Sequence, residues 1–149
     1  MPPFEMLSFG RKVGRVYGAM CAPILREYDL NQTEFDLLMF LANNPDMNTA
    51  RDACRIRGIK KGLVSVTADS LLRRGLITRA ADAGDRRIAR LTATAAAGPI
   101  VQAGREVQAE FFRALTSCLT KEELETYCAL TQKLMDHVSE LDAGGKQLD

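Results

Sequence analysis

Residues 48–94 of this 149-residue chain read NTARDACRIRGIKKGLVSVTADSLLRRGLITRAADAGDRRIARLTAT. The spacing of their apolar residues predicts a short helix, a tight turn at Gly58, a second amphipathic helix and a small β-hairpin. The tip of the hairpin carries Asp85, Arg86 and Arg87. We expect the rest of the chain to be organised around this segment, because helical patterns flank it on both sides.

The second helix of this segment, expected over about residues 60–74, has two different faces. Its apolar side chains recur at i, i+4, i+7 and i+8 and predict one buried stripe: Val64, Ala68, Leu71 and Leu72. The opposite face carries mostly small and polar residues: Gly62, Ser65, Val66, Asp69, Ser70 and Arg73. Two short helices joined by a tight turn, the second with such an outward face, are typical of a helix-turn-helix. The hairpin that follows Gly75 would be its wing.

Positive charge is concentrated in the same segment. Residues 51–90 hold 11 Lys or Arg against 4 Asp or Glu, a balance of +7, whereas the remaining residues hold 9 against 15, a balance of −6. A basic block within a chain of net charge +1 is expected of a surface that binds phosphates, because each neutralised phosphate releases a condensed counterion. The sequence therefore predicts double-stranded DNA as a partner.

Residues 4–28 predict the first helix of the chain, since their apolar residues recur at three- and four-residue spacing. Pro23 lies within this stretch. Proline has no backbone donor and clashes with the preceding turn, so we expect a kink or a break near residues 20–22.

Capping residues mark where the other helices begin. Three pairs have the spacing of a capping box: Asn31 with Glu34, Thr49 with Asp52, and Thr120 with Glu123. Thr94 is expected to cap a long helix that ends near Leu119. We expect a single domain over 1–149, mainly α with a small two- to three-stranded β wing. Its DNA-binding lobe would span about 31–94, between dimerisation helices at about 4–28 and 95–141.

Composition and motifs argue against several other classes of protein. The chain is 46% hydrophobic and 26% charged, as ordinary globular proteins are. It has no signal peptide and no run of 18 apolar residues, so we expect a cytoplasmic protein with no membrane partner. No phosphate loop, G-x-S-x-G elbow or H-E-x-x-H motif is present, and we therefore expect no enzyme activity.

The cysteines do not predict a metal site or a cofactor. Cys21, Cys54, Cys118 and Cys128 are far apart, and His137 is the only histidine. That spacing matches neither a zinc ribbon nor a disulfide scaffold. Cysteines on apolar helical faces behave as small hydrophobic residues, so a structural role is favoured over redox sensing.

Three segments taken in order resemble a known family. They are YDLNQTEFDLLMFLANNP at 28–45, NTARDACRIRGIKKGLVSVTADSLLRRGLITR at 48–79 and AADAGDRRIARLTAT at 80–94. The sharpest features are Arg-Gly-Leu-Ile at 74–77, followed by Asp82-x-x-Asp85-Arg86-Arg87. Across about residues 25–99 the chain is similar to the MarR family of winged-helix transcriptional regulators.

The resemblance implies a homodimer in which the first and the last two helices interlock. It also implies that the helix at about 60–74 enters the major groove of DNA and that a wing arginine enters the adjacent minor groove. Many relatives bind small aromatic or lipophilic effectors in a cleft between the dimer body and the DNA-binding lobe. Three positions differ from the family pattern: Val66 and Ser70 stand where relatives commonly have arginine, and Ala93 stands where they have leucine before the closing threonine.

Seven residues are candidates for contact with DNA: Lys60, Lys61, Ser65, Val66, Ser70, Arg86 and Arg87. The lysines would hold phosphates, and a narrow minor groove attracts arginine. A valine can contact a thymine methyl, and a serine can donate to or accept from a base edge. Each of them could instead be a solvated surface residue with no partner. For Asp85 we expect that it holds an arginine or caps the turn.

Four aromatic residues are candidates for an effector cleft: Tyr17, Phe40, Phe111 and Phe112. Aromatic residues at helical spacing are more often core residues, so this alternative stays open. Broad apolar stripes on the terminal helices predict a homodimer, because a small middle lobe would leave them uncovered. Two-fold symmetry then predicts a pseudo-palindromic operator.

These features predict a sequence-specific DNA-binding transcriptional regulator, a repressor that responds to a small-molecule effector. The alternative is a winged-helix dimer that binds protein and has no specific contact with DNA. Val66 and Ser70 favour that alternative, because neither supplies a strongly discriminating contact to a base.

Overall fold

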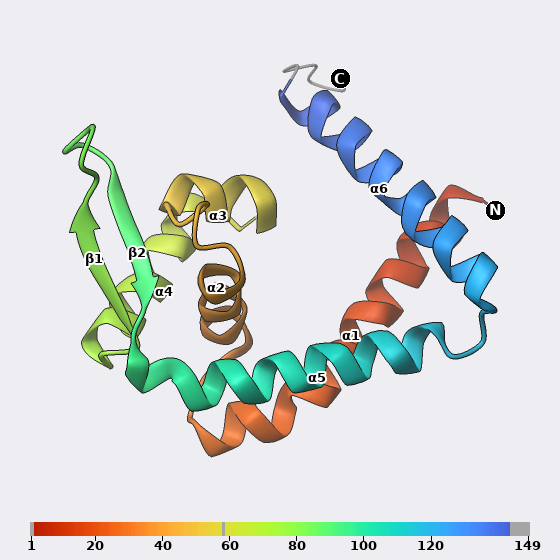
Figure 1. Cartoon of the computed structure of the whole chain (residues 1–149), viewed down its shortest axis with the longest axis horizontal. Coiled ribbons are helices and arrows are strands. Elements are labelled where there is room, and N and C mark those ends of the chain that lie inside the picture. The colour runs from red at the N-terminus through yellow and green to blue at the C-terminus, as the bar shows by residue number, and fades with distance from the viewer. Residues whose placement is uncertain (1, 58, 144–149) are drawn as a thin grey trace. The chain divides into compact units, whose positions relative to one another are not determined.

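A computed structural model describes residues 2–57 and 59–143 of the chain. In this part of the chain the elements follow in the order α1 (Pro3–Glu27), α2 (Gln32–Asn43), α3 (Ala50–Arg57), α4 (Lys61–Arg73), β1 (Ile77–Ala81), β2 (Ala89–Ala93), a 3₁₀ turn η1 (Ala95–Ala97), α5 (Gly98–Thr116) and α6 (Lys121–Ala143) (Figure 1). The expected fold class, mainly helical with a small β wing, is confirmed. Gly58, the expected turn residue, lies outside the described residues.

The chain divides into two compact units, Met1–Phe111 and Phe112–Asp149. The first holds the helix-turn-helix, the wing, α1 and most of α5, and the second holds the last turn of α5 and α6. The single domain expected over 1–149, with its lobe and dimerisation helices, stays a prediction. No helix among the described residues is long and apolar enough to cross a membrane.

The core of the first unit is built around α2 (Figure 1). Seven of its twelve residues are buried, among them Phe35, Leu37 and Leu38, and the helix contacts α1, α4 and β2. A helix with apolar residues on most of its circumference is stable only when neighbours surround it. From α4 the buried side chains are Val64, Thr67, Ala68 and Leu71. The stripe predicted for this helix is therefore confirmed in its main members.

The predicted capping pairs are confirmed. The Asn31 side chain accepts from the Glu34 backbone N–H, and Glu34 accepts from the Asn31 N–H, each at 2.9 Å. Thr49 with Asp52 and Thr120 with Glu123 exchange hydrogen bonds in the same way at the starts of α3 and α6. These bonds satisfy backbone donors that a helix start leaves without partners inside the helix.

The wing is an antiparallel pair with Ile77 opposite Ala93 and Ala81 opposite Ala89. Gly75 ends α4 with φ of +67°, a left-handed conformation that glycine adopts without a Cβ clash. An isolated antiparallel β-bridge between Thr49 and Arg90 adds one residue of a third strand beside β2. The predicted wing of two to three strands is confirmed.

Three local expectations need correction. The helix α1 continues through Pro23 without the expected break, and buried Cys21 and Ile24 pack it against the core; a kink near residues 20–22 stays a prediction. Thr94 stands before η1 but makes no side-chain cap; its hydroxyl donates to the Gly75 carbonyl oxygen at 2.7 Å and joins β2 to the end of α4. The long helix ends at Thr116, three residues before Leu119, because the Leu119 N–H closes a turn on the Thr116 carbonyl.

Candidate nucleic-acid interface

The outward face of α4 is exposed as predicted over its first two turns. Lys60 and Lys61 lie exposed at its start, and Ser65 and Val66 follow one turn later. The Val66 side chain is the most exposed apolar group of the helix, at 66%. The structure therefore brings four of the seven candidates together on the exposed first two turns of α4, with the two cations before the two groups that could meet bases.

Ser70 does not share this exposed face. Its hydroxyl donates a hydrogen bond of 2.6 Å to Oε1 of Glu34, which belongs to α2. The side chain is only partly exposed, and its donor is directed into the protein. Sequence periodicity placed Ser70 on the outward side because it lies at the boundary between the two faces of α4.

Two aspartates hold the tip of the wing. Oδ1 of Asp82 accepts from the backbone N–H groups of Gly84 at 2.8 Å and Asp85 at 3.1 Å. Asp85 in turn accepts from the Arg87 backbone N–H at 2.9 Å, so of its two expected roles the structure shows the one in capping the turn. Such Asx turns give a short exposed loop a defined backbone.

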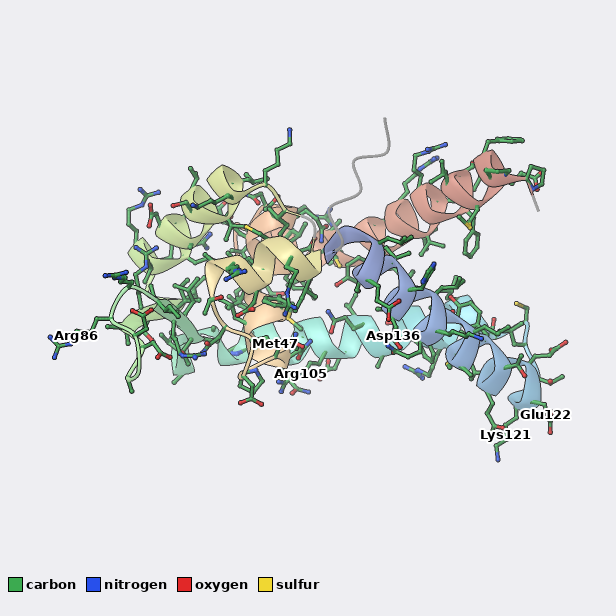
Figure 2. The ribbon with its side chains drawn as sticks, turned by 90° about the horizontal axis from the view of Figure 1, so that it is seen from above. Met47, Arg86, Arg105, Lys121, Glu122 and Asp136 are labelled. Atoms are coloured by element: carbon green, nitrogen blue, oxygen red, sulfur yellow. The ribbon has the colours of Figure 1, made fainter. Side chains whose placement is uncertain are left out.

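Arg86 and Arg87 extend from this held turn into solvent. Figure 2 shows the Arg86 side chain pointing away from the ribbon at the outer end of the hairpin. Within residues 2–57 and 59–143, no ion pair involves these two arginines or Lys60 and Lys61. Their charges are consequently available to an external anion.

The base of the wing is held by Arg90, which sequence analysis did not single out. Arg90 pairs through Nε with Asp82 and donates from Nη1 to Asn48 Oδ1 at 2.9 Å. The hydrogen bond from Arg90, followed by those from the Gly84 and Asp85 N–H groups, holds the pKa of Asp82 below its usual value. The wing arginines are thus carried on a loop anchored to the segment before α3.

Asp69 and Arg79 form a second link, from α4 to β1. Arg79 Nη2 lies 3.2 Å from Asp69 Oδ1. Asp69 belongs to the exposed face of α4, where its charge alone would repel phosphates, and Arg79 offsets that charge. The same pair shows that strand β1 of the wing lies beside this face.

Arg51 is a further basic residue that sequence analysis missed. It lines a crevice between the start of α3 and the wing, together with Arg55, Arg87 and Arg90. Arg55 is paired with Asp52 at 3.7 Å, whereas Arg51 takes part in no ion pair with another described residue. The charge count of residues 51–90 included Arg51, but only the tertiary structure places it beside Arg87.

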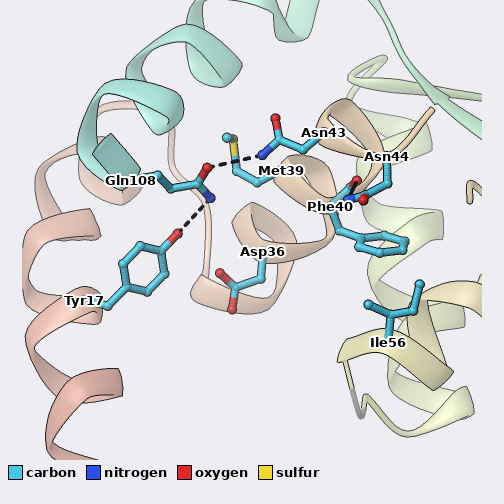
Figure 3. Close-up of a pocket in the computed structure, with 8 residues that line it drawn as sticks. All are labelled: Tyr17, Asp36, Met39, Phe40, Asn43, Asn44, Ile56 and Gln108. Carbon is cyan, nitrogen blue, oxygen red and sulfur yellow. Dashed lines mark hydrogen bonds between the residues drawn. The ribbon is translucent and has the colours of Figure 1, made fainter. Parts of the chain in front are cut away.

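Tyr17 and Phe40 line a cavity of about 180 Å³ in the first unit (Figure 3). Its other lining residues are Asp36, Met39, Asn43, Asn44, Ile56 and Gln108. Gln108 donates to the Tyr17 oxygen and accepts from the Asn43 amide, each at 3.2 Å. Burial raises the pKa of Tyr17 to about 12, so its phenol stays neutral at physiological pH.

The other two aromatic candidates lie elsewhere. Phe111 packs against Tyr17 edge to face, with ring centroids 5.2 Å apart, and does not line the cavity. Phe112 is 45% exposed and belongs to the second unit. Neighbouring residues of a helix point about 100° apart, so only one of this pair could face Tyr17.

The four cysteines are free thiols. Cys21 is fully buried beside Tyr17, and burial raises the pKa of its thiol, which lowers the fraction of reactive thiolate. Cys54 is half-buried, whereas Cys118 and Cys128 are exposed.

Comparison with known proteins shows which proteins share this architecture. Residues 28–88 match the model of the MarR family. Among solved structures, S. aureus MepR in its DNA-binding conformation is 24% identical, with a TM-score of 0.78 over 89% of this chain and 98% of that chain. The S. aureus MepR–DNA complex is also 24% identical, with a TM-score of 0.71 over 87% of this chain and 96% of that chain.

BpsR of Bordetella bronchiseptica, whose DNA binding is regulated by 6-hydroxynicotinic acid, is 18% identical, with a TM-score of 0.68 over 87% of this chain and 98% of that chain. At these identities the likeness establishes the fold. The chain therefore has a winged helix-turn-helix fold, and its residues 28–88 are similar to the MarR family.

Proposed function

We propose that the chain is a sequence-specific DNA-binding transcriptional regulator, and a repressor. The observation that carries this proposal is the set of four exposed cations without ion-pair partners among the described residues, Lys60 and Lys61 on α4 and Arg86 and Arg87 on the wing. A MepR–DNA complex among the solved structures of this fold supports it. We also infer a cytoplasmic location, because such a protein acts in the compartment that holds its DNA.

The geometry suits a division of work between helix and wing. With α4 in the major groove, Lys60 and Lys61 would bind phosphates while Ser65 and Val66 face the base edges, where valine favours a thymine methyl. The wing would bring Arg86 and Arg87 to the adjacent minor groove, whose negative potential attracts arginine.

Exposed apolar side chains support a homodimer. On α6 they recur at helical spacing: Tyr127, Leu130, Leu134, Val138 and Leu141. On α1, Phe4, Met6, Leu7, Phe9 and Val16 are at least half exposed. Apolar faces of this extent are normally covered by a partner. A second copy would give a two-fold dimer on a pseudo-palindromic operator with half-sites about 34 Å apart.

The cavity at Tyr17 and Phe40 is the proposed effector site. Its apolar walls and its amide and phenol groups suit a small aromatic or other lipophilic molecule. A small aromatic acid regulates DNA binding by BpsR, a protein of the same fold. An effector would regulate only by binding more tightly to one state of the dimer than to the other.

Fluorescence anisotropy with the DNA upstream of the protein's own gene, beside a scrambled duplex, tests the proposal. We expect preferential binding to the upstream DNA that weakens steeply as salt rises. Arg86→Ala/Arg87→Ala should lower the affinity about tenfold or more and reduce the salt slope by about 2 per protomer. Arg11→Ala/Arg15→Ala on α1 removes the same charge from two other exposed arginines and should leave the slope unchanged.

Two other results of the anisotropy experiment would contradict the proposal. Binding that does not distinguish the two duplexes would contradict a specific regulator. No binding to either duplex at low salt would favour the protein-interaction module instead. That alternative has one structural observation in its favour, since Leu63 and Val66 expose apolar surface on α4.

A further inference from the structure

Glu34 is a buried carboxylate with a contact on each oxygen. Only 7% of the residue is exposed. Oε2 accepts from the Asn31 N–H at 2.9 Å and so completes the capping box of α2. Oε1 accepts from the Ser70 hydroxyl of α4 at 2.6 Å. One side chain therefore joins the start of α2 to the second half of α4, the helix proposed to enter the major groove (the recognition helix).

Arg74 provides a second link between α4 and α2, beside the hydrogen bond between Ser70 and Glu34. It follows α4 directly, and its Nη1 lies 3.9 Å from Oε2 of Glu34. The same guanidinium donates to the carbonyl oxygen of Asp29 at 2.7 Å and to that of Tyr28. Asp29 has φ of +51°, a left-handed conformation in the turn that connects α1 to α2. The end of α4 is thus tied to this turn and to the first residues of α2.

We infer that Glu34 is a positioning residue that sets the orientation of the recognition helix through Ser70, and that Ser70 does not contact bases. This inference rests on the proposed function, because orientation matters only if α4 binds DNA. A Ser70 hydroxyl turned toward a base would leave Oε1 of buried Glu34 without this donor, and a buried acceptor without a partner is costly.

The anchor should act on specificity more than on general affinity. Ser65 and Val66 lie five and four residues before Ser70 on the same helix, so a tilt of α4 about its anchored end displaces both. Contacts to base edges require close geometry, whereas lysine and arginine hold phosphates with more tolerance. Loss of the anchor should consequently weaken binding to the preferred DNA and leave binding to scrambled DNA and the salt slope unchanged.

A double-mutant cycle in the full-length protein tests this. We expect Ser70→Ala and Glu34→Ala each to weaken binding to the upstream duplex about five- to tenfold, with little change for the scrambled duplex. Because Ser70 acts through Glu34, the double variant should bind no more weakly than Glu34→Ala alone. Ser70→Thr keeps the hydroxyl and should stay within about twofold of the wild type.

Ser65→Ala is the matched control, since it removes a hydroxyl from the exposed face of the same helix. It leaves the Glu34–Ser70 hydrogen bond intact, and its effect on binding should be smaller in the Glu34→Ala background, where the tilt of α4 already displaces Ser65 from the base edges. The inference is overturned if Ser70→Ala has its full effect in the Glu34→Ala background, or if it has none in the wild type.

Amide hydrogen exchange of the DNA-free protein gives a readout that needs no DNA. The amides of the second half of α4 should exchange faster in Ser70→Ala and unchanged in Ser65→Ala. If the wild type binds neither duplex, the proposed function fails while exchange still decides whether Ser70 anchors α4. If Glu34→Ala does not fold by circular dichroism, Glu34→Met replaces it, since methionine has a similar size and its thioether sulfur is only a weak acceptor for the Asn31 and Ser70 donors.

Discussion

Asp82 and Arg90 determine, at the scale of single residues, whether the wing presents its arginines on a defined loop. The carboxylate accepts from two backbone N–H groups of the tip and pairs with Arg90, and these contacts lower its pKa. A carboxyl whose pKa is lower in the folded state stabilises that state above its unfolded pKa, about 3.9, and loses the contribution as pH falls through the lower folded value.

We therefore predict that the wing loosens in acid. As the pH is lowered through the folded pKa of Asp82, the amide NMR signals of Gly84 and Asp85 should titrate together, with a midpoint below the ordinary aspartate value of about 3.9. Asp82→Asn keeps an acceptor for these amides but has no charge to lose, so the titration should disappear. Asp52→Asn is the control: Asp52 also has a lowered pKa, caused mainly by Thr49, and lies at α3. A titration that survives in Asp82→Asn would assign it to another group.

At the scale of elements, α5 packs closely against α2 at Gly104. A Cβ added there would lie 2.4 Å from Sδ and 2.9 Å from Cε of Met39, and 3.1 Å from Cζ of Phe35. Both neighbours are buried, and Met39 also lines the cavity beside Tyr17. The absence of a side chain at Gly104 is therefore a condition for this helix packing.

Gly104→Ala should lower the free energy of unfolding by about 1–3 kcal/mol, because an overpacked core displaces its neighbours. Met39 is flexible and would move first, so the shape of the cavity should change as well. Urea denaturation measures the loss. Gly98→Ala, on the same helix with nothing within 4 Å of the added carbon, should not destabilise the protein. Equal stability of the two variants would show that the close approach relaxes without cost.

At the scale of the whole molecule, the proposed dimer should depend on the apolar side chains of α6. Leu134 is 62% exposed and lies in the middle of the stripe. We predict that Leu134→Glu gives a monomer in sedimentation velocity, because a buried carboxylate without a partner is strongly unfavourable at an interface. Affinity for a two-half-site operator should fall about 100-fold or more, as bivalent binding is lost.

Gln132→Glu introduces the same charge on the other side of α6 and should leave the dimer intact. Gln132 is exposed and two residues from Leu134, about 200° around the helix. A wild-type protein that sediments as a monomer at micromolar concentration would contradict the homodimer. The same dissociation in both variants would show that net charge, and not the apolar stripe, controls association.

The elements of this fold could be predicted because their causes lie within a few residues of each other. Capping pairs such as Asn31 and Glu34 are three residues apart, and the stripe of α4 repeats with the helix period. Gly75 ends α4 because its own backbone adopts a positive φ. Helix starts, the helix-turn-helix, the wing and the basic block were accordingly determined by the sequence alone.

The partners of individual side chains were decided only by the tertiary structure. Ser70 meets Glu34 from 36 positions away, Arg90 meets Asn48 from 42, and Gln108 meets Tyr17 from 91. Periodicity shows which side of a helix is apolar, but it does not show which polar residue of another element contacts the boundary of that side. Residues at such boundaries, Ser70 above all, acquire their role from the packing of helices that are distant in the sequence.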